Sequence, residues 1–135
     1  MLAVKPVQDL GIANELCALC GVPFKADSYT YFAADVNEDG TKINHIIGVC
    51  TLRMKGDINE IESLMPAPGV EDEEAMLIMA RTVMNFMYRC EVKSITLADG
   101  YISPELTRKL GFSLKDGKYG IDLVEFYKAP CKFNG

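Results

Sequence analysis

Two glutamates, Glu60 and Glu62, have the residue type and spacing that could do acid–base chemistry. They lie in the segment 58–65, whose residues favour a β-strand, and side chains two residues apart in a strand point to the same face. A carboxylate held near a bound group can accept its proton. Solvent-facing acids on a half-buried strand explain the same pattern, so both interpretations stay open.

The second chemical feature is a run of four acids at residues 71–74, across the start of a predicted helix. Acids in the first turn of a helix stabilise it by roughly 0.3–1 kcal/mol each through the helix dipole. A carboxylate about 4–6 Å from a phosphate repels it by on the order of 3 kcal/mol at an effective dielectric constant near 20. We therefore expect this run to stabilise the start of the helix and to oppose an anionic ligand.

The cysteines and the single histidine do not form a metal or nucleophile motif. Cys17 and Cys20 have the spacing of a metal knuckle, but no second pair accompanies them, and Cys50, Cys90 and Cys131 are isolated. We interpret the cysteines as reduced packing residues and expect no metal site. His45 has no cysteine or serine beside it and is interpreted as a loop residue near a turn.

The composition predicts one folded domain over residues 1–135. Hydrophobic residues make up 49% and charged residues 24% of the chain, and the net charge of −5 comes mostly from the acidic run. The absence of a basic stripe argues against nucleic acid as a partner. No apolar run reaches the roughly 20 residues of a membrane helix, and the odd number of cysteines without a signal-like start leads us to expect a cytoplasmic protein.

Local patterns predict ten elements in the order β-α-β-β-β-α-β-α-β-β. Apolar residues at intervals of three and four make the helix 73–89 the clearest element. For 58–65 we favour a strand, although Ile58, Ile61 and Leu64 also have helical spacing. The other predicted strands are 2–7 at a sheet edge, 29–36, 46–52 and 94–98, with a final hairpin of 112–115 and 121–128; the other helices are 10–20, capped by Asp9, and 104–110, capped by Ser103.

This order, together with the segment Leu106-Thr107-Arg108-Lys109-Leu110-Gly111-Phe112, resembles the GNAT superfamily of N-acetyltransferases and its Leu-Tyr-x-x-Leu-Gly-Phe segment. The resemblance implies an α/β fold of the acyl-CoA N-acyltransferase type. Its mixed sheet is mainly antiparallel, with a parallel pair formed by the fourth and fifth strands. In the family these two strands splay apart, acetyl-CoA lies in the gap, and the turn after the fourth strand wraps the pyrophosphate.

The resemblance also implies an activity, the transfer of an acetyl group from acetyl-CoA to a small-molecule or peptide amine. A carboxylate of the fourth strand would be the general base, which makes Glu60 and Glu62 the candidate catalytic residues. The implied cofactor contacts are the strand backbone at Leu64 and Met65 and the turn residues Gly69, Val70 and Ala75.

The chain departs from the family at two functional positions. The family's turn reads Arg or Gln, two residues, Gly, one residue, Gly or Ala; one alignment puts Gly69, Asp72 and Glu74 at these positions, and the other puts Glu71, Glu74 and Met76 there. Thr107 stands where the family often has a tyrosine acid, and Tyr101 lies earlier in the chain. The sequence therefore leaves a second hypothesis open: a non-catalytic domain of this fold that has lost coenzyme A binding and acts as a homodimer or with a protein partner.

Overall fold

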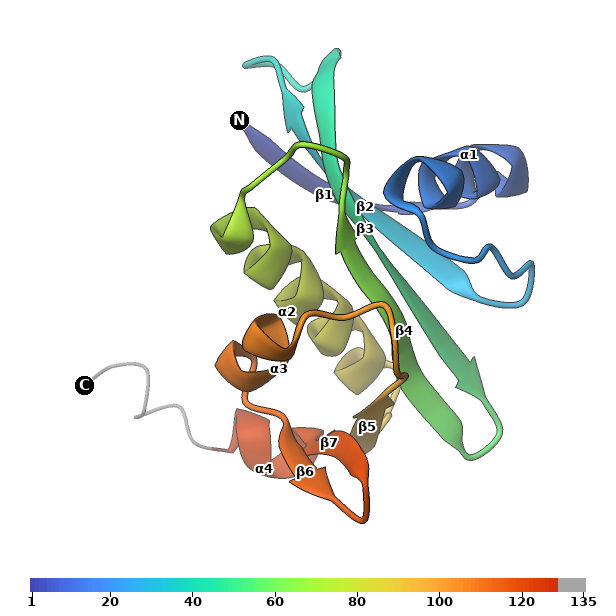
Figure 1. The fold of residues 1–135 in the computed structure, drawn as a ribbon, viewed down its shortest axis with the longest axis vertical. Helices are drawn as coiled ribbons and strands as arrows, with labels where there is room; N and C mark the ends of the chain where they lie inside the picture. Colours follow the sequence, from blue (N-terminus) through green and yellow to red (C-terminus); the bar gives the residue numbers. More distant parts are fainter. Residues whose placement is uncertain (129–135) are drawn as a thin grey trace.

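The computed structural model describes residues 1–128, which form a mixed α/β arrangement around one twisted sheet (Figure 1). The first ten elements follow the predicted order, although the last strand lies earlier in the chain than predicted, and one further helix follows them. In chain order they are β1 (Leu2–Val7), α1 (Leu10–Cys20), β2 (Tyr29–Val36), β3 (Ile43–Lys55), β4 (Ile58–Pro66), α2 (Glu73–Arg89), β5 (Ser94–Leu97), α3 (Pro104–Lys109), β6 (Ser113–Lys115), β7 (Lys118–Asp122) and α4 (Leu123–Tyr127).

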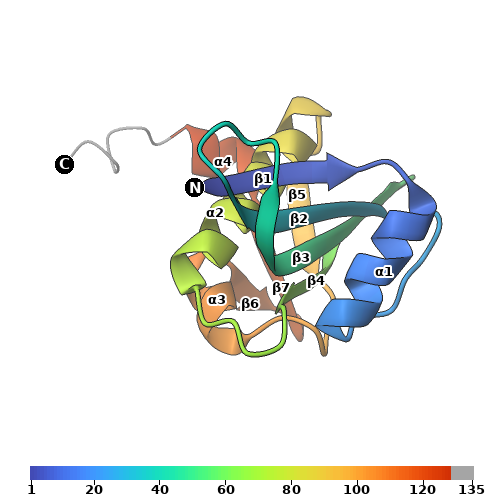
Figure 2. The same ribbon diagram turned by 90° about the horizontal axis from the view of Figure 1, so that it is seen from above.

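The sheet has seven strands in the order β1-β2-β3-β4-β5-β7-β6, with β1 at one edge as its sequence predicts. Neighbouring strands are antiparallel except β4 and β5, which are joined through α2 and pair in parallel. Helix α1 covers one face of the sheet, while α2, α3 and α4 lie on the other (Figures 1 and 2). The expected α/β fold with one parallel pair is therefore confirmed.

Helix α2 supplies seven of the 21 buried residues of the larger core. Its predicted stripe is buried against the sheet, including Met76, Met79, Met84 and Met87. The side chain of Asp72 caps the helix by accepting a hydrogen bond of 3.0 Å from the backbone N–H of Ala75. The spacing of the methionines therefore reflects packing, because flexible thioether side chains fill the uneven space between helix and sheet.

Helix α1 packs a smaller core on the opposite face. Asp9 caps it by accepting from the N–H of Ile12, and Gly21 ends it in the left-handed conformation with φ +71°. The buried face consists of Ala13, Leu16, Cys17 and Cys20. Leu10 is exposed, because it lies in the first turn beside a surface groove lined by Pro6 and Tyr29.

The prediction for the C-terminal hairpin was wrong in its second strand. A two-residue turn at Asp116 and Gly117 starts β7 already at Lys118, and the strand ends at Asp122. The carboxylate of Asp122 then accepts from the N–H of Glu125 and begins α4, which buries Leu123 completely. A cap residue followed by helically spaced apolar side chains explains why 123–127 is helical. Cys131 lies outside the described residues.

Candidate functional site

A β-bulge in β4 places Glu62 at the site. In the β3–β4 register Thr51 pairs with Ser63 and Leu52 pairs with Ile61, so Glu62 has no partner on β3. The hydroxyl groups of Thr51 and Ser63 lie 2.6 Å apart, and the N–H of Thr51 donates to the Ser63 hydroxyl over 3.2 Å. An extra residue of this kind bends its strand and re-aims a side chain. Here the extra residue is Glu62.

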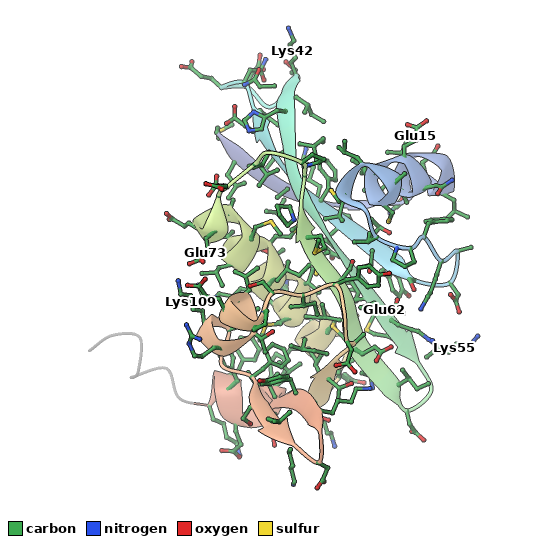
Figure 3. All side chains as sticks on the ribbon, in the orientation of Figure 1. Glu15, Lys42, Lys55, Glu62, Glu73 and Lys109 are labelled. Atoms are coloured by element: carbon green, nitrogen blue, oxygen red, sulfur yellow. The ribbon has the colours of Figure 1, made fainter. Side chains whose placement is uncertain are left out.

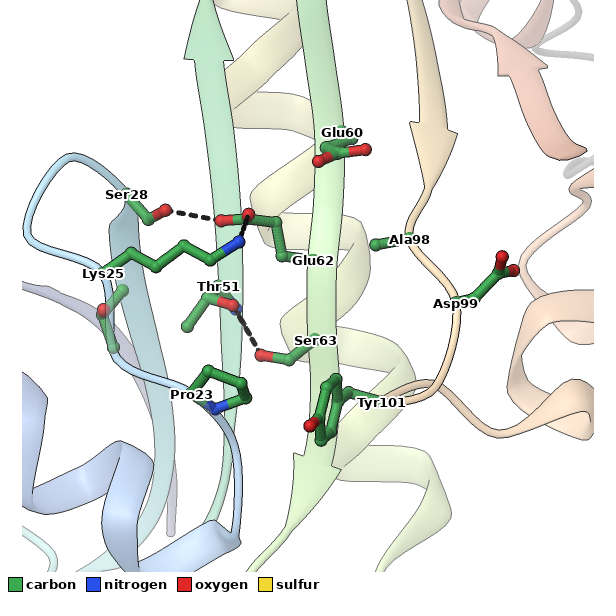
Figure 4. Close-up of a pocket in the computed structure, with 11 residues that line it drawn as sticks. Pro23, Lys25, Ser28, Thr51, Glu60, Glu62, Ser63, Ala98, Asp99 and Tyr101 are labelled. Carbon is green, nitrogen blue, oxygen red and sulfur yellow. Dashed lines mark hydrogen bonds and ion pairs between the residues drawn. The ribbon is translucent and has the colours of Figure 1, made fainter.

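A cavity of about 130 Å³ lies beside this bulge (Figure 4). Glu60 and Glu62 both contribute to its wall, as expected for side chains on one face of the strand. Polar side chains dominate the rest of the lining. The lining residues are Pro23, Lys25, Ser28, Thr30, Thr51, Glu60, Glu62, Ser63, Ala98, Asp99 and Tyr101.

Glu62 is a buried carboxylate whose two oxygens both accept hydrogen bonds. Lys25 Nζ donates to Oε2 over 2.9 Å, and Ser28 Oγ donates to Oε1 over 2.5 Å (Figure 4). The Glu62 side chain is 9% exposed, whereas that of Lys25 is 51% exposed. The hydrogen bond to Glu62, and then the charge of this carboxylate, raise the pKa of Lys25. The cavity thus already holds one ammonium group against a carboxylate.

The carboxylate of Glu60 has a longer ion-pair contact than that of Glu62. Its closest cation is Lys118 Nζ of β7, 3.6 Å from Oε2. Lys118 does not line the cavity, although it is as exposed as Lys25. One β4 carboxylate therefore pairs with an amine inside the cavity, and the other pairs with an amine beside it.

The sequence provided no signal for three residues of the cavity. Lys25 and Ser28 come from the irregular segment 21–28 between α1 and β2, and Asp99 follows β5. Tyr101, the tyrosine that lies earlier in the chain than Thr107, does line the cavity. Thr107, at the family's tyrosine position, is buried and donates its hydroxyl to the carbonyl of Ser103.

The gap between β4 and β5 is bridged by the segment 98–102. The strands pair at Glu60–Thr96 and Ile61–Leu97, and the N–H of Ala98 donates to the carbonyl of Ile61. Beyond the bulge the chain returns to β4, where the N–H of Leu64 donates to the carbonyl of Tyr101 over 2.8 Å. A parallel bridge between Leu64 and Ile102 extends this contact.

Polar groups of the turn between β4 and α2 already have partners within the protein. The N–H of Val70 donates to the carbonyl of Ala67, and Gly69 has φ +76°. Asp72 caps α2, and Glu73 forms an ion pair with Lys109 of α3 (Figure 3). The predicted role of the acidic run at the start of the helix therefore rests on defined contacts of Asp72 and Glu73.

Five residues were expected to contact coenzyme A, and three of them use their backbone N–H groups internally. Leu64 donates to Tyr101, Val70 to Ala67, and Ala75 to the side chain of Asp72. Met65 packs half-buried against the α1 core, while Gly69 is exposed in the turn. In this conformation these three N–H groups already have hydrogen-bond acceptors within the protein.

Within residues 1–128, no cysteine or histidine lines the cavity. Cys17, Cys20 and Cys50 are buried, and desolvation raises the pKa of Cys20 to about 11. Among residues 1–128, no group of three or more His, Cys, Asp or Glu side chains could hold a metal ion. The placement of His45 in a loop was wrong: it lies within β3 and pairs with Asp35, because β3 extends to Ile43.

The fold is the one seen in solved structures of acetyltransferases. No family model matches the sequence, and no curated protein is significantly similar to it. Solved structures match it closely in fold. The IAA acetyltransferase of Bacillus cereus has a TM-score of 0.66 at 13% identity, over 90% of this chain and 99% of that one.

Two further matches connect the fold to the family and to coenzyme A. A Desulfovibrio desulfuricans protein assigned to the GNAT family has a TM-score of 0.63 at 13% identity, over 91% of this chain and 99% of that one. The PaiA N-acetyltransferase of Thermoplasma acidophilum, solved in complex with coenzyme A, has a TM-score of 0.58 at 12% identity, over 89% of this chain and 96% of that one. Within residues 1–128, no helix is long and apolar enough to cross a membrane.

Proposed function

We propose that this protein is an N-acetyltransferase that moves an acetyl group from acetyl-CoA to an amine bound in the cavity beside β4. The observation that carries this proposal is the position of Glu62. This buried carboxylate lies on a β-bulge next to the parallel β4/β5 pair, in a fold that matches acetyltransferases over most of their length. An amine attacks a thioester only as the free base, so it needs such a proton acceptor.

In this proposal Glu62 orients the ammonium group of the acceptor and accepts its proton, while Glu60 adds negative charge at the other side of the cavity. Acetyl-CoA, when bound, supplies the electrophilic thioester carbonyl. Tyr101 is the candidate proton donor to the leaving group, because it is the tyrosine of the cavity. Binding of the donor between β4 and β5 requires the segment 98–102 to leave Leu64.

A second function is favoured by one specific observation, the hydrogen bond between Leu64 and Tyr101. A protein that never opens this contact would be a non-catalytic member of the fold, acting through its surface. The acidic turn supports the same alternative, since Asp72 already satisfies the N–H of Ala75 at the start of α2.

Calorimetric titration with acetyl-CoA separates the two functions. If the protein is an enzyme, the titration should give saturable heat at micromolar to low millimolar acetyl-CoA. The Glu62→Gln variant should retain that binding while losing transfer of the acetyl group to an amine. Absence of binding at millimolar acetyl-CoA would exclude the enzyme. A Glu71→Gln/Glu74→Gln variant then tests the charge of the turn: if charge is the obstacle, this variant gains affinity, and if it also fails to bind, the closed gap is the obstacle.

A further inference from the structure

The ammonium group of Lys25 lies where a cationic ligand of the cavity would lie. Its Nζ is 2.9 Å from the Glu62 carboxylate, and its side chain forms part of the cavity wall (Figure 4). We infer that the cavity binds a primary alkylammonium ion that carries no carboxylate, and that Lys25 is an internal competitor which the ligand displaces from Glu62. This inference rests on the proposed function and specifies its acceptor.

The charges of the cavity select the ligand class. Among the lining residues three are carboxylates, Glu60, Glu62 and Asp99, and one is a cation, Lys25. A ligand with its own carboxylate near the amine, such as a free amino acid, would meet repulsion from Glu60 and Asp99. At the position of the Lys25 ammonium, an alkylammonium ion is attracted above all by Glu62 and also by Glu60, and this attraction exceeds the repulsion from Arg53.

The size of the cavity sets a second limit on the ligand. At about 130 Å³ it is small beside the roughly 300–1,000 Å³ of ordinary ligand pockets. Its wall carries the hydroxyl-bearing residues Ser28, Thr30, Thr51 and Ser63, which suit the N–H donors of an ammonium head. The bound part of the ligand is therefore a slender chain end, of the kind that the lysine side chain itself provides.

The side chain of Lys25 can move out of the cavity, whereas that of Glu62 cannot. Lys25 belongs to the irregular segment 21–28 and is 51% exposed, so its flexible side chain can turn into solvent. Glu62 is anchored on β4 and 9% exposed. A buried carboxylate without a cation is unfavourable. The departure of Lys25 therefore favours entry of a second ammonium, and the two compete for one position.

The experiment is an NMR titration of the full chain with n-butylammonium chloride at pH 7, without acetyl-CoA. We expect saturable shifts of backbone amides at Ser28, Ser63 and Asp99, and no such shifts with butyrate or n-butanol. Lys25→Met should tighten n-butylammonium binding by about two- to fivefold, the range that a partly exposed ion pair supports. Glu62→Gln should abolish it.

Lys118→Met is the matched control, because Lys118 pairs with the other β4 carboxylate and has the same exposure but does not line the cavity. It should change n-butylammonium affinity less than Lys25→Met does. Lys25→Arg keeps a cation on Glu62, so this variant should bind n-butylammonium no more tightly than the wild type does. It replaces Lys25→Met in the comparison if Lys25→Met does not fold.

The inference is overturned if n-butylammonium gives no saturable shifts in the wild type and in Lys25→Met. Equal tightening by Lys118→Met would also overturn it. These outcomes are independent of the acetyl-CoA titration, so failure of the proposed function and failure of this inference remain distinguishable.

Discussion

The backbone N–H of Leu64 donates a hydrogen bond of 2.8 Å to the carbonyl of Tyr101, and this contact bridges the gap between β4 and β5. In the GNAT fold this gap is where the family resemblance places acetyl-CoA. The same segment, 98–102, also supplies Ala98, Asp99 and Tyr101 to the cavity wall. Movement of this one segment would therefore open the cavity and release the Leu64 amide together.

We predict that Ile102→Ala weakens this closure. Ile102 is partly buried against the main core and forms the bridge to Leu64. The substitution should lower the free energy of unfolding by about 1–2 kcal/mol, less than for a fully buried isoleucine. It should also accelerate hydrogen exchange of the Leu64 amide and, if the protein binds acetyl-CoA, tighten that binding.

The control for Ile102→Ala is Ile58→Ala, at an exposed position near the start of β4. It should leave exchange at Leu64 unchanged. Unchanged Leu64 exchange in Ile102→Ala would show that the segment is held by other contacts.

We predict that the cap of α2 depends on the side chain of Asp72. Asp72→Ala removes the acceptor for the Ala75 N–H and should lower the free energy of unfolding by about 1 kcal/mol. Asp72→Asn keeps a cap acceptor while removing the charge, so it should cost less. Urea denaturation of both variants measures the difference, with the exposed Glu71→Ala as control; equal losses in Asp72→Ala and Glu71→Ala would contradict the capping role.

We predict that Gly48 in β3 does not tolerate a side chain. A Cβ atom there would lie 2.7 Å from the Met65 carbonyl oxygen and 2.7 Å from the sulfur of Met76. Gly48→Ala should therefore lower the free energy of unfolding by about 1–3 kcal/mol, as overpacking does. The comparison is Gly120→Ala in β7, where the nearest atom would be the Ile95 carbonyl oxygen at 3.4 Å. Thermal unfolding should show a clearly smaller effect there, and a reversed order would refute the steric argument.

We predict a pH dependence from the Lys25–Glu62 pair. The hydrogen bond and charge of Glu62 raise the pKa of Lys25 above its ordinary value of 10.5. A raised pKa means that the folded state binds the proton more tightly, so the pair stabilises the protein below about pH 10.5 and this contribution is lost as the pH rises through the folded pKa. In Glu62→Gln, an NMR titration of the Lys25 side chain should give a lower pKa than in the wild type. An unchanged pKa would mean that the ion pair does not persist in solution.

Local patterns predicted most of the elements because caps and apolar spacing act within a few residues. Helix α2 has the predicted bounds, since Asp72 precedes a continuous stripe of apolar side chains. The prediction of the C-terminal hairpin was wrong for a related reason. Residues 121–128 contain alternating and helically spaced apolar side chains at once, and the early turn at Asp116 and Gly117 decided between them.

By itself, the sequence determined the order of strands and helices, the acidic start of α2 and the presence of two carboxylates on β4, because these depend on neighbours along the chain. Only the tertiary structure decided which groups those carboxylates meet. Glu62 meets Lys25 across 37 residues, and Leu64 of β4 meets Tyr101 of the segment that follows β5. Such contacts depend on strand register and on the path of irregular segments, where no periodic pattern records the partner.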